Sequence, residues 1–141
     1  MAYQLQKKFI IDTQDKSVGV SLPFTKGNNG FFAVTYTTKE QIKSDLKNLI
    51  LTNRGERVMQ PEFGCNLRQA IFEQIDEGGV YEFIQNEIET SIQRWLPFVI
   101  VNNIVVNSDA NSKDNNRINV KLDYTLSFAG NNSRDSLNIT V

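Results

Sequence analysis

The clearest pattern along this chain is a strict alternation of apolar and polar residues toward its C-terminal end. Apolar side chains occupy every second position from Ile118 to Phe128, and polar or charged side chains lie between them. A strand with one buried face requires this period of two. Residues 118 to 128 are therefore predicted to form a half-buried strand.

Two further strands are predicted around it. Residues 99 to 106 are rich in β-branched side chains, and the last residues place Leu137, Ile139 and Val141 on one face. The polar segment from residue 107 to 116 is expected to be an exposed hairpin loop, and Gly130-Asn131-Asn132 is expected to turn the chain into the last strand. The C-terminal part therefore predicts a small antiparallel sheet.

A helical period marks the middle of the chain. Thr38-Lys39-Glu40-Gln41 fits a capping box, and the apolar stripe that follows predicts a helix over residues 39 to 52. Asn66 is expected to cap a short helix that ends before Gly78-Gly79. A third helix is predicted over residues 80 to 95, because Pro97 disfavours helical backbone at the residue before it.

Helices ahead of a run of strands predict an α+β fold, in which three helices pack on one face of the small antiparallel C-terminal sheet. Residues 1 to 37 carry only short apolar clusters and are expected to form an extended N-terminal arm or strands. We therefore expect the arm at 1–37 and a single α+β domain at 38–141.

Composition narrows the classes of partner. The 141 residues have a net charge of −1 with dispersed Lys and Arg, so we expect no nucleic-acid partner. No apolar run approaches the roughly 20 residues that a membrane span needs, so no membrane partner is expected. The single Cys65 and the polar start of the chain predict synthesis in a reducing cytoplasm.

The chain offers little catalytic equipment. It contains no histidine, which excludes Ser-His-Asp, Cys-His and histidine-based metal chemistry. Glycine-rich phosphate loops are also missing, so no cofactor and no metal is expected. Cys65, with apolar Phe63 and Leu67 two residues away on either side, is interpreted as a small core residue. A carboxylate pair formed by Glu56 and Glu62 remains as an alternative, because glycosidases work with two such groups.

The densest motif runs from Leu49 to Leu67 and reads L-I-L-T-N-R-G-E-R-V-M-Q-P-E-F-G-C-N-L. The residues have a structural interpretation, in which Gly55 stops a helix, Pro61 stiffens a connection and Gly64 allows a turn. The three charges of Arg54, Glu56 and Arg57 either hold this loop in a local network or face a partner.

The motif resembles the signature of the baseplate wedge and sheath-initiator family of contractile phage tails, which is shared with a type VI secretion baseplate subunit that has a lysozyme-like label. Phe72-Glu73 continues the match, and Gly19, Pro23-Phe24 and Gly30 resemble residues that precede the first helix in many members. Some members carry Glu-Pro-Arg where this chain has Leu96-Pro97-Phe98, so only Pro97 carries over.

The resemblance implies a structural subunit in the tail baseplate of a virion, made in the host cytoplasm, that joins wedge proteins and starts the sheath. It implies wedge subunits and tail sheath protein as partners, with tube or hub proteins as further candidates. The last strand could bind an added strand if it lies at a sheet edge. The candidate partner-binding residues are Arg54, Glu56, Arg57, Pro61, Glu62, Pro97, Leu137, Ile139 and Val141.

Two other function classes stay open at the level of sequence. The first is a peptidoglycan-cleaving muramidase, because members of the family have been labelled lysozyme-like and acidic residues are present. The second is a generic cytoplasmic binding module, which would be a stable monomer without affinity for wedge or sheath proteins. Cell-wall lysis would support the first class. A failure to co-purify with wedge or sheath proteins would support the second.

Overall fold

The structure is a computed structural model that describes residues 16–27, 30–72, 77–107, 118–128 and 131–140. The chain forms two compact units, Met1–Asp45 and Leu46–Val141, and the boundary between them falls inside the first helix. Each unit is described by itself. The expected division into an arm at 1–37 and a domain at 38–141 stays a prediction.

The first unit contains a short antiparallel ribbon. Strand β1 (Gly19–Val20) pairs with β2 (Val34–Thr35), and Gly19 lies opposite Thr35. Two backbone hydrogen bonds extend the pairing, from Val18 N–H to the Thr35 carbonyl and from Ser21 N–H to the Ala33 carbonyl. Each strand has only two residues, which agrees with the short apolar clusters in this segment.

Helix α1 (Thr38–Leu51) confirms the helix expected over residues 39 to 52. The predicted cap was wrong by one residue. Thr37, rather than Thr38, accepts a hydrogen bond from the Glu40 N–H through its hydroxyl oxygen, at 3.2 Å. The Gln41 amide oxygen accepts a hydrogen bond from the Thr35 hydroxyl at 2.7 Å. Threonines at both 37 and 38 allow either frame, and Glu40 stands three residues after Thr37 as a capping box requires.

Two helices follow, α2 (Leu67–Phe72) and α3 (Glu77–Trp95). The prediction that α3 begins at residue 80 was wrong, because Gly78 and Gly79 lie inside its first turn. Backbone N–H groups of a first helical turn lack helical partners in any case, so glycine is tolerated there better than in a helix interior. The other end of α3 falls at Trp95, two residues before Pro97, as expected.

The C-terminal sheet has the order β3-β4-β5, with both pairs antiparallel. Strand β3 spans Val99–Asn107, β4 spans Asn119–Phe128 and β5 spans Asn131–Thr140. The register of β3 against β4 shifts between Val101 and Asn103. The loop expected over residues 107 to 116 lies almost wholly outside the described residues. Asn131 and Asn132, expected in a turn, belong to β5.

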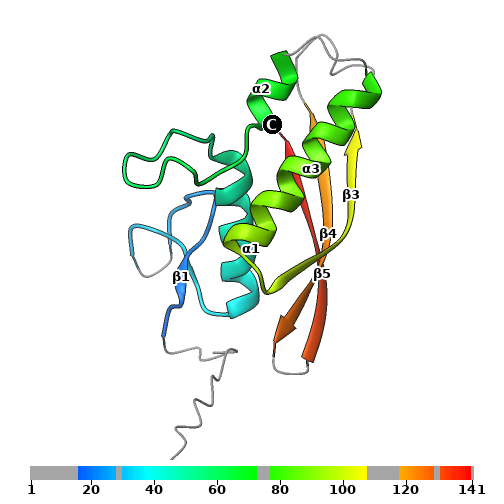
Figure 1. Ribbon diagram of the computed structural model, residues 1–141. Helices are drawn as coiled ribbons and strands as arrows, with labels where there is room; N and C mark the ends of the chain where they lie inside the picture. The colour runs from blue at the N-terminus through cyan, green and yellow to red at the C-terminus, as the bar shows by residue number, and fades with distance from the viewer. Residues whose placement is uncertain (1–15, 28–29, 73–76, 108–117, 129–130, 141) are drawn as a thin grey trace, which may run out of the picture. The chain divides into compact units, whose positions relative to one another are not determined.

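The second unit buries one face of its sheet. Alternate residues of β4 are buried, as their pattern predicted, and Leu137 and Ile139 of β5 join them. In Figure 1, α3 runs across the sheet beside β3, and the two elements are in contact. Three helices and a small antiparallel C-terminal sheet confirm the α+β fold class. The buried apolar residues of this unit are Leu46, Leu49, Ile50, Cys65, Leu67, Ile84, Ile88, Ile92, Val99, Ile104, Val120, Leu122, Tyr124, Leu126, Leu137 and Ile139.

Candidate functional site

The segment between α1 and α2, residues 52–66, is here called the signature loop. Figure 1 shows it projecting from the ends of these helices as a long excursion. Backbone hydrogen bonds close it at two levels, from Cys65 N–H to the Thr52 carbonyl at 2.9 Å and from Gly55 N–H to the Pro61 carbonyl at 2.7 Å. The loop is therefore an ordered structure with its own hydrogen bonds.

Two glycines set the path of the signature loop. Gly55 has a φ of 85° and Gly64 a φ of 113°, conformations that side chains with a Cβ rarely adopt. A Cβ on Gly64 would also lie only 2.2 Å from the Thr52 carbonyl oxygen, whereas one on Gly55 would meet open space. Gly64 takes the turn role expected for it, whereas Gly55 lies four residues after Leu51, the last residue of α1, and so does not stop that helix directly. Gly64 meets a steric requirement in addition to the conformational one.

The base of the loop is fastened to α3 by a polar network. Arg54 forms an ion pair with Glu87 at 3.0 Å, and its guanidinium also lies 3.4 Å from the Ser91 hydroxyl. The Ser91 hydroxyl, which is buried, donates a hydrogen bond to the Gly64 carbonyl at 3.1 Å. One helix face therefore holds both the start and the end of the signature loop.

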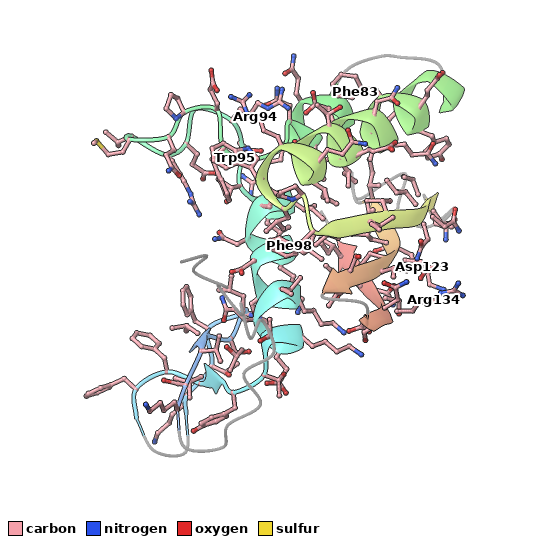
Figure 2. The ribbon with its side chains drawn as sticks, turned by 60° about the horizontal axis from the view of Figure 1, so that its bottom comes forward. Phe83, Arg94, Trp95, Phe98, Asp123 and Arg134 are labelled. Atoms are coloured by element: carbon pink, nitrogen blue, oxygen red, sulfur yellow. The ribbon has the colours of Figure 1, made fainter. Side chains whose placement is uncertain are left out.

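A second set of contacts lies one turn further along α3. Figure 2 shows Arg94 and Trp95 on the side of α3 next to the loop. The Arg94 guanidinium forms an ion pair with Glu62, and the Trp95 ring packs edge-on against Phe63 with centroids 5.2 Å apart. The Arg57 guanidinium stacks over Phe63 at 3.7 Å from the ring centroid, a cation-π geometry. These contacts hold the far half of the loop.

Each candidate charged residue of the loop has an intramolecular contact. Besides the pairs of Arg54, Arg57 and Glu62, the Glu56 carboxylate accepts a hydrogen bond from the Asn53 N–H at 2.9 Å. Pro61 is exposed, and its carbonyl closes the loop. Partner contacts by these residues stay a prediction. Glu56 and Glu62 are both exposed, unlike a glycosidase acid in an apolar pocket.

The tip of the signature loop is apolar, a feature that the sequence reasoning missed. Val58 and Met59 are 95% and 91% exposed, the highest values for large apolar residues among those of this unit whose exposure the structure describes. The signal in the sequence is a pair of consecutive apolar residues within the connection between two helices.

Cys65 lies at the end of the loop and is fully buried. Burial raises the pKa of its thiol to about 11, and the negative charge of Glu87 acts in the same direction. A thiol with such a pKa is a poor nucleophile near neutral pH. This agrees with its interpretation as a core residue.

Strand β5 forms one edge of the three-stranded sheet. It pairs with β4, and no other described strand pairs with it. The opposite edge strand, β3, contacts α3, and its Ile104 carbonyl accepts a hydrogen bond from the Gln85 amide at 2.9 Å. The side chains of Leu137 and Ile139 are buried and cannot contact a partner directly. What β5 can offer a partner is the backbone along its edge and the side chains of its other, polar face. Val141 lies outside the described residues.

Pro97, the remaining candidate, is exposed just after the end of α3. The chain reverses around it through hydrogen bonds from Leu96 N–H to the Ile92 carbonyl and from Val99 N–H to the Leu96 carbonyl. Pro97 follows Arg94 and Trp95 by only three and two positions, and these two residues contact Glu62 and Phe63 of the signature loop. Its partner contact stays a prediction.

Among the residues that the structure describes, no three His, Cys, Asp or Glu side chains are placed to share a metal ion. None of the helices in the described ranges combines the length and the apolar character that crossing a bilayer requires.

Comparison with solved structures finds the same fold in two proteins. A "putative tail lysozyme" from Geobacter sulfurreducens superposes with a TM-score of 0.61 and 24% identity over 73% of this chain and 88% of that chain. A chain of the anti-feeding prophage baseplate superposes with a TM-score of 0.57 and 21% identity over 86% of this chain and 81% of that chain. A chain of the postcontracted pyocin R2 baseplate gives a TM-score of 0.44 and 20% identity over 70% and 81%.

Comparison with curated protein sequences finds no match. The family model described as baseplate wedge protein gp25 matches residues 37–130, which is about two thirds of the chain. The matched residues include the signature loop and α3, and they end before β5. The chain belongs to the baseplate wedge protein gp25 family.

Proposed function

We propose that this chain is a non-enzymatic structural subunit of a contractile tail baseplate, where it joins wedge proteins and starts assembly of the sheath. Membership of the baseplate wedge family carries the proposal. Its place would be the baseplate of a phage or a phage-like particle, consistent with the fold shared with a chain of the anti-feeding prophage baseplate.

In this proposal β5 is the site of sheath initiation. A strand at a sheet edge carries backbone N–H and C=O groups that an incoming strand can bind by β-augmentation. β5 is ten residues long and pairs with β4 along its whole length, from Asn131 to Thr140. The side chains of Leu137 and Ile139 are buried in the core, and this packing holds β5 in place while its edge stays available. The bound strand would come from the tail sheath protein.

The signature loop and Pro97 are the proposed contact with the neighbouring wedge subunits. Both lie around α3, because Arg54 and Glu62 bind this helix and Pro97 follows its last residue by two positions. This separates a wedge-binding region from the sheath-binding edge of β5. Tube or hub proteins remain further candidate partners of the same chain.

The direct test is to delete the gene for this chain in a strain that produces the particle and to examine tails by electron microscopy. The expected result is tube or baseplate material without sheath, restored by supplying the chain in trans. Normal sheathed tails in the deletion strain would contradict the proposal.

A muramidase is the second candidate, motivated by the fold shared with the protein described as a tail lysozyme. Glu56 and Glu62 would have to carry the reaction, yet Glu56 binds the Asn53 N–H and Glu62 pairs with Arg94. Purified chain is expected to release no soluble fragments from peptidoglycan. Lysis that Glu56→Gln or Glu62→Gln abolishes would establish the enzyme instead.

A further inference from the structure

The charged residues of the signature loop contact α3 or the loop itself, while its apolar tip is exposed to solvent. Val58 and Met59 expose nearly their whole side chains, at 95% and 91%. Leaving two adjacent apolar side chains in water is unfavourable, since each buried CH₂ group contributes about 0.8 kcal/mol. Two adjacent exposed apolar side chains at the tip of a projecting loop indicate an interaction site.

The tip is held in place before any partner binds. The Gln60 N–H donates to the Arg57 carbonyl, which closes a turn with Val58 and Met59 at its centre, and the Phe63 N–H donates to the Gln60 carbonyl. The Arg57 stack on Phe63 then connects the tip to Trp95 on α3. An ordered loop loses little conformational entropy on binding, which makes its apolar side chains efficient anchors.

We propose that Val58 and Met59 are a two-residue anchor that inserts into an apolar pocket on another protein of the baseplate. This rests on the proposed function and adds the chemistry of the contact. The partner pocket must be concave, uncharged at its floor and wide enough for a valine and a methionine side chain. Buried apolar anchors surrounded by polar residues are the usual centres of protein interfaces.

The charge of the loop selects a protein over a lipid surface as the occupant. Residues 52–66 contain two arginines and two glutamates, Arg54, Arg57, Glu56 and Glu62, so the loop has no net charge. Peripheral membrane binding by a short apolar tip depends on added attraction between basic residues and anionic lipids. The guanidinium of Arg54 is moreover paired with Glu87, and that of Arg57 stacks on Phe63, so both are already engaged within the chain. These features favour a protein as the occupant over a lipid surface.

Methionine oxidation tests the anchor within the whole particle. The chain has two methionines, Met1 and Met59, so a tryptic peptide reports on Met59 alone. Free chain and purified baseplates receive the same dose of hydrogen peroxide, and mass spectrometry measures sulfoxide formation at Met59. The expected result is at least a tenfold slower oxidation in the baseplate than in the free chain.

Failure of the anchor and failure of the proposed function give different results. If the chain is present in the baseplate and Met59 oxidises there as fast as in the free chain, the anchor is overturned and the proposed function stands. If the purified baseplate lacks the chain, both are overturned.

Substitution of the two tip residues is a second test of the anchor, and a variant of a neighbouring loop residue is its matched control. The double variant Val58→Ser, Met59→Ser is expected to lower incorporation into baseplates at least tenfold in a deletion strain. Gln60→Ser removes an exposed polar side chain next to the tip and is expected to stay within twofold of the wild type. Circular dichroism on both purified variants confirms folding. Equal incorporation of the two folded variants would overturn the anchor.

Other occupants have their own signatures. Tip-dependent binding of the free chain to vesicles of phosphatidylcholine and phosphatidylglycerol would assign the anchor to a membrane and overturn the protein pocket. Tip-dependent dimerisation of the free chain in analytical ultracentrifugation would assign it to a second copy. The expected result is a monomer that does not bind the vesicles.

Discussion

The buried hydroxyl of Ser91 on α3 donates a hydrogen bond to the carbonyl oxygen of Gly64, 27 residues earlier in the chain, at 3.1 Å. Because Arg54 lies 3.4 Å from the same hydroxyl, a single helix residue touches both ends of the signature loop. Ser91→Ala should therefore lower the free energy of unfolding by about 1 to 2 kcal/mol, the cost of leaving a buried carbonyl without a partner. Urea denaturation measures it, and exposed Ser127→Ala, expected to change less than about 0.5 kcal/mol, is the control.

Gly64 should be the most sensitive glycine of the loop. Gly64→Ala combines a φ of 113° with a Cβ placed 2.2 Å from the Thr52 carbonyl oxygen, so we expect a loss of about 2 to 4 kcal/mol. Gly55→Ala has a similar φ without the clash and should lose about 1 to 2 kcal/mol. Urea denaturation of both variants separates the two contributions. Equal losses would show that the close approach to Thr52 carries no cost.

The two ion pairs between the loop and α3 should differ in strength because they differ in exposure. The side chains of Arg54 and Glu87 are 36% and 16% exposed, whereas those of Arg94 and Glu62 are 58% and 67% exposed. Double-mutant cycles to alanine should give a coupling of about 1 kcal/mol for the first pair and below about 0.5 kcal/mol for the second. A larger coupling at the exposed pair would contradict this account.

Stability should fall in alkaline solution partly through Cys65. Burial raises its thiol pKa from 9.0 to about 11, so the folded state holds a proton that the unfolded state releases. The stabilising effect is complete below pH 9 and is lost as pH rises through about 11, at most about 2 to 3 kcal/mol. Burial also raises the pKa of Tyr124, which acts in the same direction.

Cys65→Ala isolates the thiol from the tyrosine. Urea denaturation at pH 8 and at pH 10.5 should show a smaller drop in the free energy of unfolding for the variant than for the wild type. The drop that remains in the variant would come from Tyr124 and other groups. An unchanged drop would mean that Cys65 does not titrate differently in the two states.

Hydrogen exchange should reveal the open edge of β5. In an antiparallel edge strand about half of the backbone N–H groups point away from the neighbouring strand. A peptide covering residues 131–140 should therefore exchange about half of its amides quickly in the free chain. In assembled tails the same peptide should be protected. Equal exchange in both states would contradict β-augmentation at β5.

Local sequence patterns predicted most of the fold. The alternation from Ile118 to Phe128 identified β4, and the apolar stripe after Thr38 identified α1, because each pattern matches one element's geometry. The cap at Thr37 and the start of α3 at Glu77 were missed because adjacent residues satisfy the same local rules. Element ends depend on single hydrogen bonds, which neighbouring residues can exchange.

The site was predictable in position but not in its contacts. The signature from Leu49 to Leu67 identified the loop, and Gly64 takes the turn conformation expected from it. The partners of Arg54 and Glu62 are 33 and 32 residues away on α3, and no local pattern connects them. From the sequence alone, the charged residues of the loop were therefore the candidates for partner contacts. Val58 and Met59, which the structure shows to be exposed, were not.

The most direct measurement of the central claim is a cryo-electron microscopy map of the complete particle in which this chain can be traced. The account predicts this chain in the baseplate, with a strand of the sheath protein hydrogen-bonded along β5 from Asn131 to Thr140. A particle without the chain, or a traced chain whose β5 edge faces solvent while sheath contacts another surface, would contradict it.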